Sequence, residues 1–526
     1  MKRLLSEFFT PAIARQAGYT QKDGGGAGIS FSPDPLVTGL EYDSRKIKGG
    51  ELFFALPGLH VDGHRFISDA VRRGAAVIVH ERELSRPEKG PVYIQVENSR
   101  FAMSPVSAAF YDFPSRRMRI IGVTGTEGKS TTVYLIWQLL QLLGKKAGFF
   151  STVQYSFGEG EFQNPEHQTT PEAPAVQKLL REMAEKGAEY AVVEASSHGL
   201  SERTNRLGDV DFDAAVLTNV THEHLEFHGN WEQYRFDKAN LFRSLDLRGE
   251  AKNGGPARFG VINADDPSAD YFAGATKQET RRFSVRGMEA DISLRSIESS
   301  AGGNWYEVSV DGNEIIDIRD QLPGAFNAGN VLAALLAVSG ILETPVRDIV
   351  PLVPRLKPVR GRMTGIKNSL GFEVLVDYAH TPSSFLAVFP PLRNRLNKTG
   401  GRIISLFGSA GERDTKKRRE QGRIAAAYSD IMILTDEDPR GEKPEDILEE
   451  IAGGAPERKR GENLFLIPHR PLAIRKALSL ARKGDVVLLL GKGHENSIIY
   501  ADKIMSFDEI GETQKALEEL THPADE

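Results

Sequence analysis

The sequence predicts an α/β protein of about three domains, and three observations support this fold class. The chain has 526 residues, which is more than a single hydrophobic core usually serves. An apolar run at 118–124 leads through a glycine-rich turn into a helical pattern at 130–143, and this order opens a parallel α/β domain. Apolar runs and helical patterns then alternate through the last third of the chain, which indicates a further α/β sheet.

The composition excludes several classes of function. Cysteine is absent, so disulfides, thiolate nucleophiles and cysteine-ligated zinc are excluded. The net charge of -6 gives no reason to expect nucleic acid or a membrane surface as a partner. Residues 1–20 lack the apolar core of a signal peptide, and no apolar run has the length of a membrane span. We therefore expect a cytoplasmic protein with neither nucleic acid nor membrane as a partner.

Residues 1–117 form the first predicted domain. Short strand-like and helix-like segments alternate there, and the glycines at 24–26 indicate a loop. Proline and charged residues at 111–117 interrupt the apolar pattern, so this segment is predicted to be a linker.

Residues 118–359 form the second predicted domain. The strand at 118–124 precedes a helix at 130–143, and Gly144 stands where a C-cap belongs. Further strands are predicted at 190–195 and 214–219. The apolar residues that share one face of the helix are Val133, Ile136, Leu140 and Leu143.

Residues 360–526 form the third predicted domain, which has an α/β pattern again. The predicted strands lie at 374–376, 403–407, 431–434 and 486–490, with helices at 420–428 and 472–481 among them. Each of these strands ends in a polar loop that contains Gly or Pro. Since ligands bind outside the carboxyl ends of the strands in open α/β sheets, we expect the chemistry in these four loops.

The strongest functional signal is segment 122–132, which reads Gly-Val-Thr-Gly-Thr-Glu-Gly-Lys-Ser-Thr-Thr. Its glycines let backbone N–H groups turn toward a phosphate, and the following helix adds partial positive charge. Lys129 can reach the β- and γ-phosphates, and the Ser130 hydroxyl suits Mg²⁺. The first glycine is Gly122, one residue earlier than in the general pattern. The alternative is a tight strand–helix turn with a surface lysine; the flanking strand and helix favour the phosphate loop.

Acids and imidazoles follow the next two strands. Glu194 ends a buried run, a place where a carboxylate commonly binds the magnesium of a nucleotide. Segment 218–229 adds Glu223 and three histidines, His222, His224 and His228. The spacing fits no structural zinc site, whereas coordination of Mg²⁺ and a plain surface loop both remain open.

Taken together, these motifs resemble the Mur ligases over nearly the whole chain and in the order of that family. The segments that carry the resemblance are 43–45, 51–58, 62–64, 125–131, 169–172, 194–199, 223–229, 263–266, 324–330, 361–362, 377–382, 438–440 and 491–495.

The resemblance implies an N-terminal UDP-binding α/β domain at 1–117, a central P-loop ATPase-like parallel-sheet domain at 118–359, and a C-terminal Rossmann-like, amino-acid-binding domain at 360–526. It implies an ATP-dependent ligase of peptidoglycan synthesis that adds a diamino acid to the D-glutamyl residue of UDP-N-acetylmuramoyl-L-alanyl-D-glutamate through an acyl phosphate. The implied cofactors are ATP and Mg²⁺, the partners are these small molecules, and the protein is expected to be a monomer.

The resemblance also implies roles for individual residues. Those expected at ATP are Gly125, Thr126, Glu127, Gly128, Lys129, Ser130, Thr131, Asn327, Asn330 and Arg362. Those expected at the metal are Ser130, Glu194, His224 and Lys238. The catalytic set is Lys129, Lys238, Glu194, His224, Asp377 and His380. The muramoyl substrate is expected at Ser44, Thr169, Thr170 and Ser197, and the amino acid at Arg413, Asp438, Arg440, Gly491 and Glu495.

Lys238 matches the lysine that the family carbamylates. A carbamate supplies an anionic oxygen ligand, whereas a free ammonium beside magnesium would be repelled; the alternative is an exposed helix lysine. The chain departs from the family at Glu127, usually Asn, at Ser130, usually Thr, and at Glu223, usually Asp. Glu127 adds negative charge near the triphosphate and either points away or serves magnesium.

Two residues give opposite indications about the amino acid. Arg440 can hold a carboxylate in a fork, which favours meso-diaminopimelate. Asp438 would favour a bare ammonium, which indicates L-lysine or L-ornithine, and we favour the latter pair. Glu495 is expected to take the amino group of the substrate.

Two rival functions remain. One is another ligase of this fold, a different Mur ligase or a folylpolyglutamate synthetase, which the segments at 43–45 and 491–495 disfavour. The other is an inactive nucleotide-binding module, which the intact Lys129, Glu194 and Asp377 disfavour. The basic run at 416–419 is predicted to be a solvated helix face rather than a nucleic-acid site.

Overall fold

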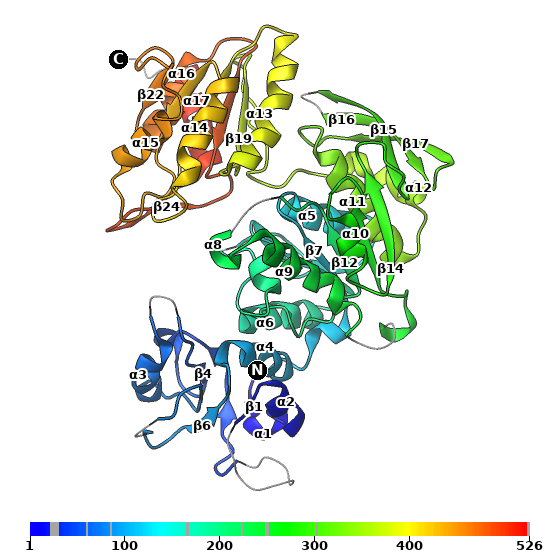
Figure 1. The fold of residues 1–526 in the computed structure, drawn as a ribbon, viewed down its shortest axis with the longest axis vertical. Helices are drawn as coiled ribbons and strands as arrows, with labels where there is room; N and C mark the ends of the chain where they lie inside the picture. Colours follow the sequence, from blue (N-terminus) through cyan, green and yellow to red (C-terminus); the bar gives the residue numbers. More distant parts are fainter. Residues whose placement is uncertain are drawn as a thin grey trace. The chain divides into compact units, whose positions relative to one another are not determined.

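The computed structural model describes residues 1–20, 31–58, 61–84, 87–164, 168–221, 225–247, 252–300 and 303–522. The chain divides into two compact units. Unit 1 comprises Met1–Ser293, Ser309–Ile315 and Gly329–Leu352, and unit 2 comprises Leu294–Val308, Ile316–Ala328 and Val353–Glu526. Each unit contains parallel sheet and helices, as Figure 1 shows, so the predicted α/β class is confirmed.

The N-terminal part of unit 1 contains a four-stranded parallel sheet of order β3-β4-β5-β6. Its strands are β3 (Leu40–Glu41), β4 (Leu52–Phe54), β5 (Val77–His80) and β6 (Val92–Gln95). The neighbouring elements are β1 (Arg3–Leu4), α1 (Leu5–Phe8), α2 (Pro11–Gln16), β2 (Leu36–Val37), α3 (Ile67–Arg72) and α4 (Ser99–Phe110). Side chains of β4 and β5 are buried on both faces of this sheet, which is why these strands are almost wholly apolar.

In the central sheet, the phosphate loop follows the inner strand β7. The order of this sheet is β10-β9-β8-β11-β7-β12-β13-β14-β15-β16-β17. The first strands are β7 (Arg119–Thr124), β8 (Ala147–Phe150), β9 (Gln154–Ser156), β10 (Phe162–Gln163), β11 (Tyr190–Glu194) and β12 (Ala214–Leu217). The remaining strands are β13 (Phe259–Asn263), β14 (Glu279–Ser284), β15 (Ile292–Ser300), β16 (Gly303–Val310) and β17 (Glu314–Asp320). Since β7 pairs in parallel with both β11 and β12, the loops after these three strands leave the sheet at the same edge.

The helices of this region are α5 (Lys129–Leu142), α6 (Ala173–Glu185), α7 (Ser197–Leu200), α8 (Leu225–His228), α9 (Trp231–Ser244), α10 (Ala269–Ala273), α11 (Asn327–Leu342) and α12 (Val346–Ile349). Helices α5 to α10 lie between successive strands of this sheet in the sequence, and α11 and α12 follow its last strand, β17. Among the described residues, no single helix is long and apolar enough to span a membrane. One bent pair, Asn327–Leu342 with Val346–Arg355, passes that test together, although the first of these helices is largely buried in the protein.

Unit 2 contains a six-stranded sheet of order β18-β19-β23-β20-β21-β22. The strands are β18 (Thr364–Gly365), β19 (Glu373–Asp377), β20 (Ile403–Phe407), β21 (Ile431–Leu434), β22 (Leu464–Leu466) and β23 (Val486–Leu490). All pairs are parallel except that of the edge strand β18 with β19. The strand of this sheet that comes last in the sequence, β23, therefore lies between β19 and β20, and the loops after these three strands are neighbours.

Helices cover both faces of this sheet (Figure 1). They are α13 (Pro382–Asn397), α14 (Lys416–Tyr428), α15 (Pro444–Ala452), α16 (Arg470–Leu480) and α17 (Glu509–Thr521). The first three contribute to one buried apolar cluster and the last two to another. A small hairpin, β24 (Ser497–Ile499) with β25 (Ile504–Ser506), precedes α17.

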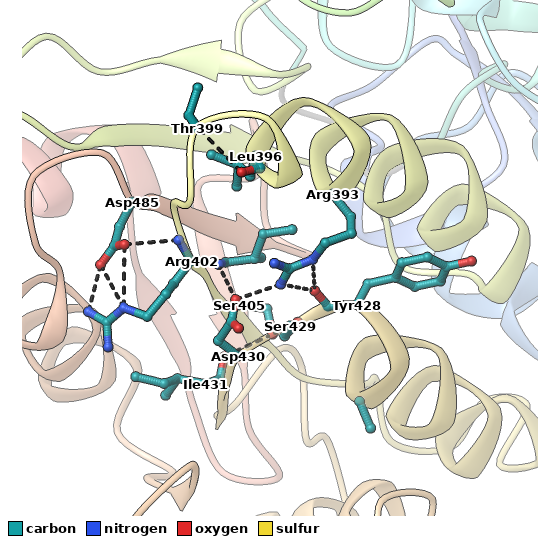
Figure 2. A network of polar contacts seen from close by, with 12 residues as sticks. Arg393, Leu396, Thr399, Arg402, Ser405, Tyr428, Ser429, Asp430, Ile431 and Asp485 are labelled. Atoms are coloured by element: carbon teal, nitrogen blue, oxygen red, sulfur yellow. Dashed lines mark hydrogen bonds and ion pairs between the residues drawn. The ribbon is translucent and has the colours of Figure 1, made fainter.

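A polar network fastens the amino ends of these strands, opposite to the loops in which we expect chemistry (Figure 2). Arg393 of α13 donates to the Tyr428 carbonyl and to Asp430, at 2.9 and 2.5 Å. Asp430 in turn accepts from the Ile403 backbone N–H at 2.7 Å. Asp485, just before β23, accepts from the backbone N–H of Arg402 at 2.9 Å. Charge-assisted bonds of this kind hold the strand starts in register.

The structure contains the predicted strands and helices, with different bounds for several of them. Strands β20, β21 and β23 have the predicted bounds, whereas α14 begins at Lys416, four residues before the predicted start at 420. The basic run therefore forms the first turn of a helix, and it is not wholly solvated. Arg418 is fully buried and donates to Glu442 and Glu450 at 2.8 and 3.0 Å. A buried guanidinium needs such partners, which the sequence spacing did not reveal.

Candidate active site

The phosphate loop follows β7, and its two positive-φ glycines leave no room for a side chain. Gly125 has φ +150°, and a Cβ there would lie 1.9 Å from the Thr218 Oγ1 atom. Gly128 has φ +82°, and its Cβ would lie 2.4 Å from Asn330 Oδ1. These contacts explain why glycine is required at both places. They also bring the predicted ATP residues Asn330 and Gly128 together within unit 1.

The loop is anchored to the segment after β12. The backbone N–H groups of Thr126 and Glu127 donate to Asn219, to its carbonyl at 2.8 Å and to its Oδ1 at 2.9 Å. Thr218 Oγ1 and Asn219 Nδ2 both donate to the Glu127 carbonyl, at 2.6 and 3.1 Å. Thr218 and Asn219 were not predicted as site residues. The feature that could have indicated them is their position directly after β12, the strand that pairs with the phosphate-loop strand β7.

Glu194 is a buried carboxylate at the carboxyl end of β11. It is 1% exposed, and its Oε2 accepts from Ser130 Oγ at 2.9 Å and from the Thr152 backbone N–H at 2.8 Å. Its Oε1 accepts from Thr152 Oγ1 at 3.1 Å. The structure thus brings together two of the predicted metal residues, Ser130 and Glu194, and adds Thr152, which the sequence did not indicate.

Both predicted active-site lysines bond to the phosphate loop itself. Lys129 Nζ donates to the Thr126 carbonyl at 2.7 Å. Lys238 lies on α9, is 1% exposed, and donates to the Gly125 carbonyl at 2.5 Å. The alternative of an exposed helix lysine is therefore wrong for Lys238. Tyr234, one turn earlier on the same helix, contacts Thr126 Oγ1 through its hydroxyl at 3.0 Å.

The residues expected at the muramoyl substrate fall into two groups. Thr170 is 1% exposed, and its Oγ1 donates to the Glu194 carbonyl at 3.0 Å. Ser197, 2% exposed, begins α7 directly after this strand end, and Thr169 precedes Thr170 in a half-buried position. Ser44 belongs to the N-terminal sheet region, where its hydroxyl donates to Asp69 at 2.9 Å.

In unit 2, Asp377 ends β19 and is held by backbone donors. Its carboxylate accepts from the N–H groups of Met363 and Ala379, both at 2.7 Å. Burial raises the pKa of Asp377, and the nearby Arg362 opposes this rise. The Arg362 guanidinium lies 4.8 Å from the ring centre of Tyr378, a cation–π distance. His380 Nδ1 donates to the Tyr378 carbonyl at 2.9 Å.

The loops after β21 and β23 share a buried cluster of charges. Lys492 is 1% exposed and donates to Asp438 at 2.9 Å and, through a very short contact, to Glu495. Glu495 also accepts from the Tyr378 hydroxyl at 3.2 Å. Glu437 lies beside Gly491, and burial raises its pKa. Its Oε2 atom is buried without a hydrogen-bond partner among the described residues.

This cluster changes the interpretation of Asp438. The sequence indicated a free carboxylate that would attract an ammonium of the substrate, yet Lys492 of the protein already bonds to it. Arg440 has φ +53° and follows Asp438 in the same loop. Arg413 is exposed in the loop after β20. Lys492 was not predicted as a site residue, although its neighbour Gly491 was.

Two further predicted site residues are His224, expected at the metal, and Asn327, expected at ATP. His224, with His222 and Glu223, lies outside the described residues. Asn327 starts α11 and donates from Nδ2 to the Pro323 carbonyl at 2.8 Å. Within the described ranges, no group of three or more His, Asp or Glu side chains could hold a metal ion.

Three sequence families match successive parts of the chain. The family described as "Mur ligase family, catalytic domain" matches residues 36–111. The "Mur ligase middle domain" matches residues 123–338, and the "Mur ligase, glutamate ligase domain" matches residues 361–493.

Individual proteins match over most of the chain. The UDP-N-acetylmuramyl-tripeptide synthetase of Treponema denticola is 52% identical over 504 residues, which cover 92% of this chain and 94% of that protein. The UDP-N-acetylmuramoyl-L-alanyl-D-glutamate–2,6-diaminopimelate ligase of Geobacillus kaustophilus is 36% identical over 494 residues, which cover 93% and 97% of the two chains.

Solved structures show the same architecture. One UDP-N-acetylmuramoyl-L-alanyl-D-glutamate–2,6-diaminopimelate ligase matches with a TM-score of 0.62 at 27% identity and covers 99% of this chain and 100% of that chain. The MurF ligase from Thermotoga maritima in complex with ADP matches with a TM-score of 0.60 at 21% identity, over 92% and 98% of the chains. The second likeness concerns the fold alone.

Proposed function

This chain belongs to the Mur ligase family, and we propose that it adds a diamino acid to the D-glutamyl residue of UDP-N-acetylmuramoyl-L-alanyl-D-glutamate. It is an ATP-dependent, amide-forming ligase of peptidoglycan synthesis with the three-domain α/β fold of that family. The observation that carries the proposal is the 52% identity to a tripeptide synthetase over 92% of the chain. We propose the domain bounds 1–117, 118–359 and 360–526, a monomeric state and action in the cytoplasm.

The proposed reaction has two steps. The γ-phosphoryl group of ATP passes to the D-glutamyl carboxylate, which gives ADP and an acyl phosphate. The amine of the diamino acid then attacks the acyl carbon, and phosphate leaves with its electron pair as the amide forms. Such chemistry needs positioning and neutralisation of charge more than covalent help from the protein. Because acyl phosphates hydrolyse in water, the reacting groups must also be shielded from solvent.

The phosphate loop supports the first step. Loop N–H groups and the N-terminus of α5 suit the triphosphate, and Lys129 would exchange its bond to the Thr126 carbonyl for phosphate oxygens. We propose that Asp377, His380 and Arg362 of unit 2 act on ATP, as in the family. Glu127 is half-buried, and its backbone rather than its side chain joins the anchoring bonds to Asn219.

The residues around Glu194 fit a magnesium ion. Ser130 Oγ and the Glu194 carboxylate lie 2.9 Å apart, and both are oxygen donors of the kind that a hard divalent cation prefers. We propose that they hold it together with His224 and a carbamylated Lys238. Magnesium at this place supplies positive charge against the triphosphate.

Carbamylation of Lys238 is compatible with its present contact. A carbamate nitrogen keeps one N–H group, so the bond to the Gly125 carbonyl can persist while the added oxygens face the metal. Incubation with ¹³C-bicarbonate should give a carbamate carbon signal in the wild type. Absence of that signal, or its persistence in Lys238→Arg, would contradict the assignment.

We propose L-lysine or L-ornithine as the amino acid. Three carboxylates, Glu437, Asp438 and Glu495, face two ammonium groups, Lys492 and Lys417. Burial raises the pKa of Glu437 and so disfavours its charged form, and the side-chain ammonium of the substrate would supply a positive charge that favours it. The additional carboxylate of meso-diaminopimelate would enter the same acidic surroundings and be repelled. Arg440 then remains for the α-carboxylate that all three amino acids share.

The experiment that tests this function measures phosphate release from ATP by the purified protein with UDP-N-acetylmuramoyl-L-Ala-D-Glu. L-Lysine, L-ornithine and meso-diaminopimelate are offered separately, and the product is weighed by mass spectrometry. Release with L-lysine or L-ornithine, with a product heavier by that amino acid, is the expected result. No release with any of the three, from folded protein that binds ATP, would sink the proposal.

A further inference from the structure

A buried chain of three side chains lies beside the phosphate loop, and the mechanism above does not use it. His228 Nε2 lies 3.1 Å from Ser197 Oγ, and His228 Nδ1 lies 2.7 Å from Asp237 Oδ2. The exposed fractions of Ser197, His228 and Asp237 are 2%, 4% and 1%. Polar groups buried this deeply must be paired, and each of the three finds partners in this chain.

The donor and acceptor in each hydrogen bond between Ser197, His228 and Asp237 can be assigned from the chemistry of these side chains. Asp237 accepts at its other oxygen, Oδ1, from Gln233 Nε2 at 2.9 Å, so both of its oxygens act as acceptors. A carboxylate has no proton to donate, and His228 Nδ1 is therefore the donor to Asp237. In the neutral imidazole the opposite nitrogen, Nε2, is then an acceptor. It follows that the Ser197 hydroxyl donates its proton to His228.

This assignment fixes what Ser197 can offer to a ligand. Its single proton is engaged by His228, so the lone pairs of Ser197 Oγ remain. They can accept a hydrogen bond from an N–H or O–H group, whereas a carboxylate or phosphate oxygen finds no donor at Ser197.

Asp237, at the other end of this hydrogen-bonded series, lies on α9, the helix that also contacts the phosphate loop. Tyr234, Asp237 and Lys238 stand at positions i, i+3 and i+4 of α9, a spacing that puts them on one face. Tyr234 contacts Thr126 at 3.0 Å and Lys238 donates to Gly125 at 2.5 Å. One helix face therefore binds the phosphate loop and, through Asp237 and His228, the start of α7.

We propose that His228 is a positioning residue that holds the Ser197 hydroxyl as a hydrogen-bond acceptor for an N–H or O–H group of the muramoyl dipeptide. This inference rests on the proposed function, because it takes the muramoyl dipeptide as the ligand of Ser197. It adds a residue outside the predicted set and states the chemical class of the substrate group. His228 acts only through Ser197, so its loss should affect the nucleotide dipeptide and spare ATP.

A double-mutant cycle tests this coupling. Ser197→Ala and His228→Asn should each raise the KM for UDP-N-acetylmuramoyl-L-Ala-D-Glu about tenfold, the scale of one lost hydrogen bond, with the KM for ATP and the kcat little changed. The double variant should be no worse than Ser197→Ala alone, because the two residues act as a unit. His228→Gln, whose amide oxygen can replace Nε2 as acceptor, should restore part of the affinity, and its KM between those of the wild type and Ser197→Ala tests the coupling if the Asn variant does not fold.

The matched control removes a different bond between the same two helices. Asn240 of α9 donates to the Leu200 carbonyl of α7 at 3.0 Å, and Asn240→Ala should leave the KM for the dipeptide unchanged. An equal rise in Asn240→Ala, or additive losses in the double variant, would overturn the role of His228 and leave the ligase function standing. Calorimetry that finds no binding of the dipeptide to the wild type would overturn both.

Discussion

Asp438 illustrates how the meaning of one residue depends on its partner. A free carboxylate in this loop would attract an ammonium of the substrate, but Lys492 lies 2.9 Å from it and compensates its charge. The excess of carboxylates over ammonium groups is then a property of the whole cluster of Glu437, Asp438 and Glu495 with Lys492 and Lys417. We therefore expect selectivity for a cationic side chain to depend on the charge sum of this cluster and not on Asp438 alone.

Asp438→Asn should shift the amino-acid preference. The substitution removes one negative charge and leaves two carboxylates against two ammonium groups. We expect the ratio of kcat/KM for L-lysine or L-ornithine to that for meso-diaminopimelate to fall about tenfold, since a buried charge contributes on the order of 1.4 kcal/mol or more to discrimination. Competition between the amino acids, read by product mass, measures the ratio. The exposed Asp502→Asn is the charge-matched control, and an unchanged ratio in Asp438→Asn would contradict the argument.

Asp436 should make stability depend on pH. Burial raises its pKa from 3.8 to about 6, although the Tyr500 hydroxyl donates to its Oδ2 at 2.9 Å. The folded state therefore binds this proton more tightly than the unfolded chain. The associated stability is fully present below pH 3.8 and is lost as pH rises through about 6. Asp436→Asn should remove this loss and raise stability at pH 8 relative to pH 5, as measured by urea unfolding at both values. A difference equal to that of the wild type would refute the assignment.

At the scale of elements, helix α16 holds the loop after β21 and the end of β23 in place. Arg470 at its start is 0% exposed and forms two bonds of 2.7 Å with Glu509 of α17. The same guanidinium donates to the carbonyls of Asp436 and Leu490 at 2.9 and 2.7 Å. These carbonyls lie in the loop after β21 and at the end of β23. Arg470 thus links the loop after β21 and the end of β23 to helices α16 and α17.

Arg470→Met should therefore destabilise the protein strongly. The substitution leaves Glu509 buried without its counter-ion, and breaking such a pair costs about 3–5 kcal/mol. Arg475 on the same helix pairs with Glu512 and Glu519 at the surface, where its side chain is 30% exposed. Arg475→Met is the matched control and should cost about 0–1 kcal/mol. Equal losses of unfolding free energy in the two variants would show that burial does not decide the effect.

The sequence allowed some elements to be predicted and not others, for physical reasons. Strands β21 and β23 are uninterrupted apolar runs between polar or glycine residues, and β20 is such a run except for Ser405. Near-continuous apolar runs are typical of buried parallel strands. The polar strands β15, β16 and β17 carry no such run and were not predicted. The bounds of the three domains stay predictions.

The candidate site shows the same contrast. Glu194 and Lys129 follow local motifs, so their placement beside the phosphate loop was predictable. The bond between Lys492 and Asp438 joins residues 54 positions apart, and it depends on β23 returning into the middle of the sheet. No local pattern contains that information. The place of Asp237 on the same helix face as Tyr234 and Lys238 could have been predicted, because the three residues have helical spacing in the sequence.

At the scale of the whole molecule, we expect the amine-binding groups to be distinct from the groups that serve phosphoryl transfer. The phosphate loop, Glu194 and Lys238 belong to unit 1, whereas the charged cluster around Lys492 and Glu495 belongs to unit 2. The amine is needed only after the acyl phosphate exists. Loss of an amine-binding group should therefore stop formation of the amide and leave formation of the acyl phosphate intact. Kinetics of the overall reaction cannot distinguish these two steps.

Hydroxylamine can make this separation visible, because it converts an acyl phosphate into a stable hydroxamate. With ATP and UDP-N-acetylmuramoyl-L-Ala-D-Glu but no amino acid, the wild type and Glu495→Ala should both form the hydroxamate. Lys129→Ala should form none, since it lacks the cation that meets the β- and γ-phosphates. When the amino acid is added, Glu495→Ala should yield at least tenfold less amide than the wild type, on the order of one lost charged hydrogen bond. If Glu495→Ala keeps its fold by thermal unfolding yet forms no hydroxamate, Glu495 takes part in phosphoryl transfer, and its assignment to the amine-binding step alone is wrong.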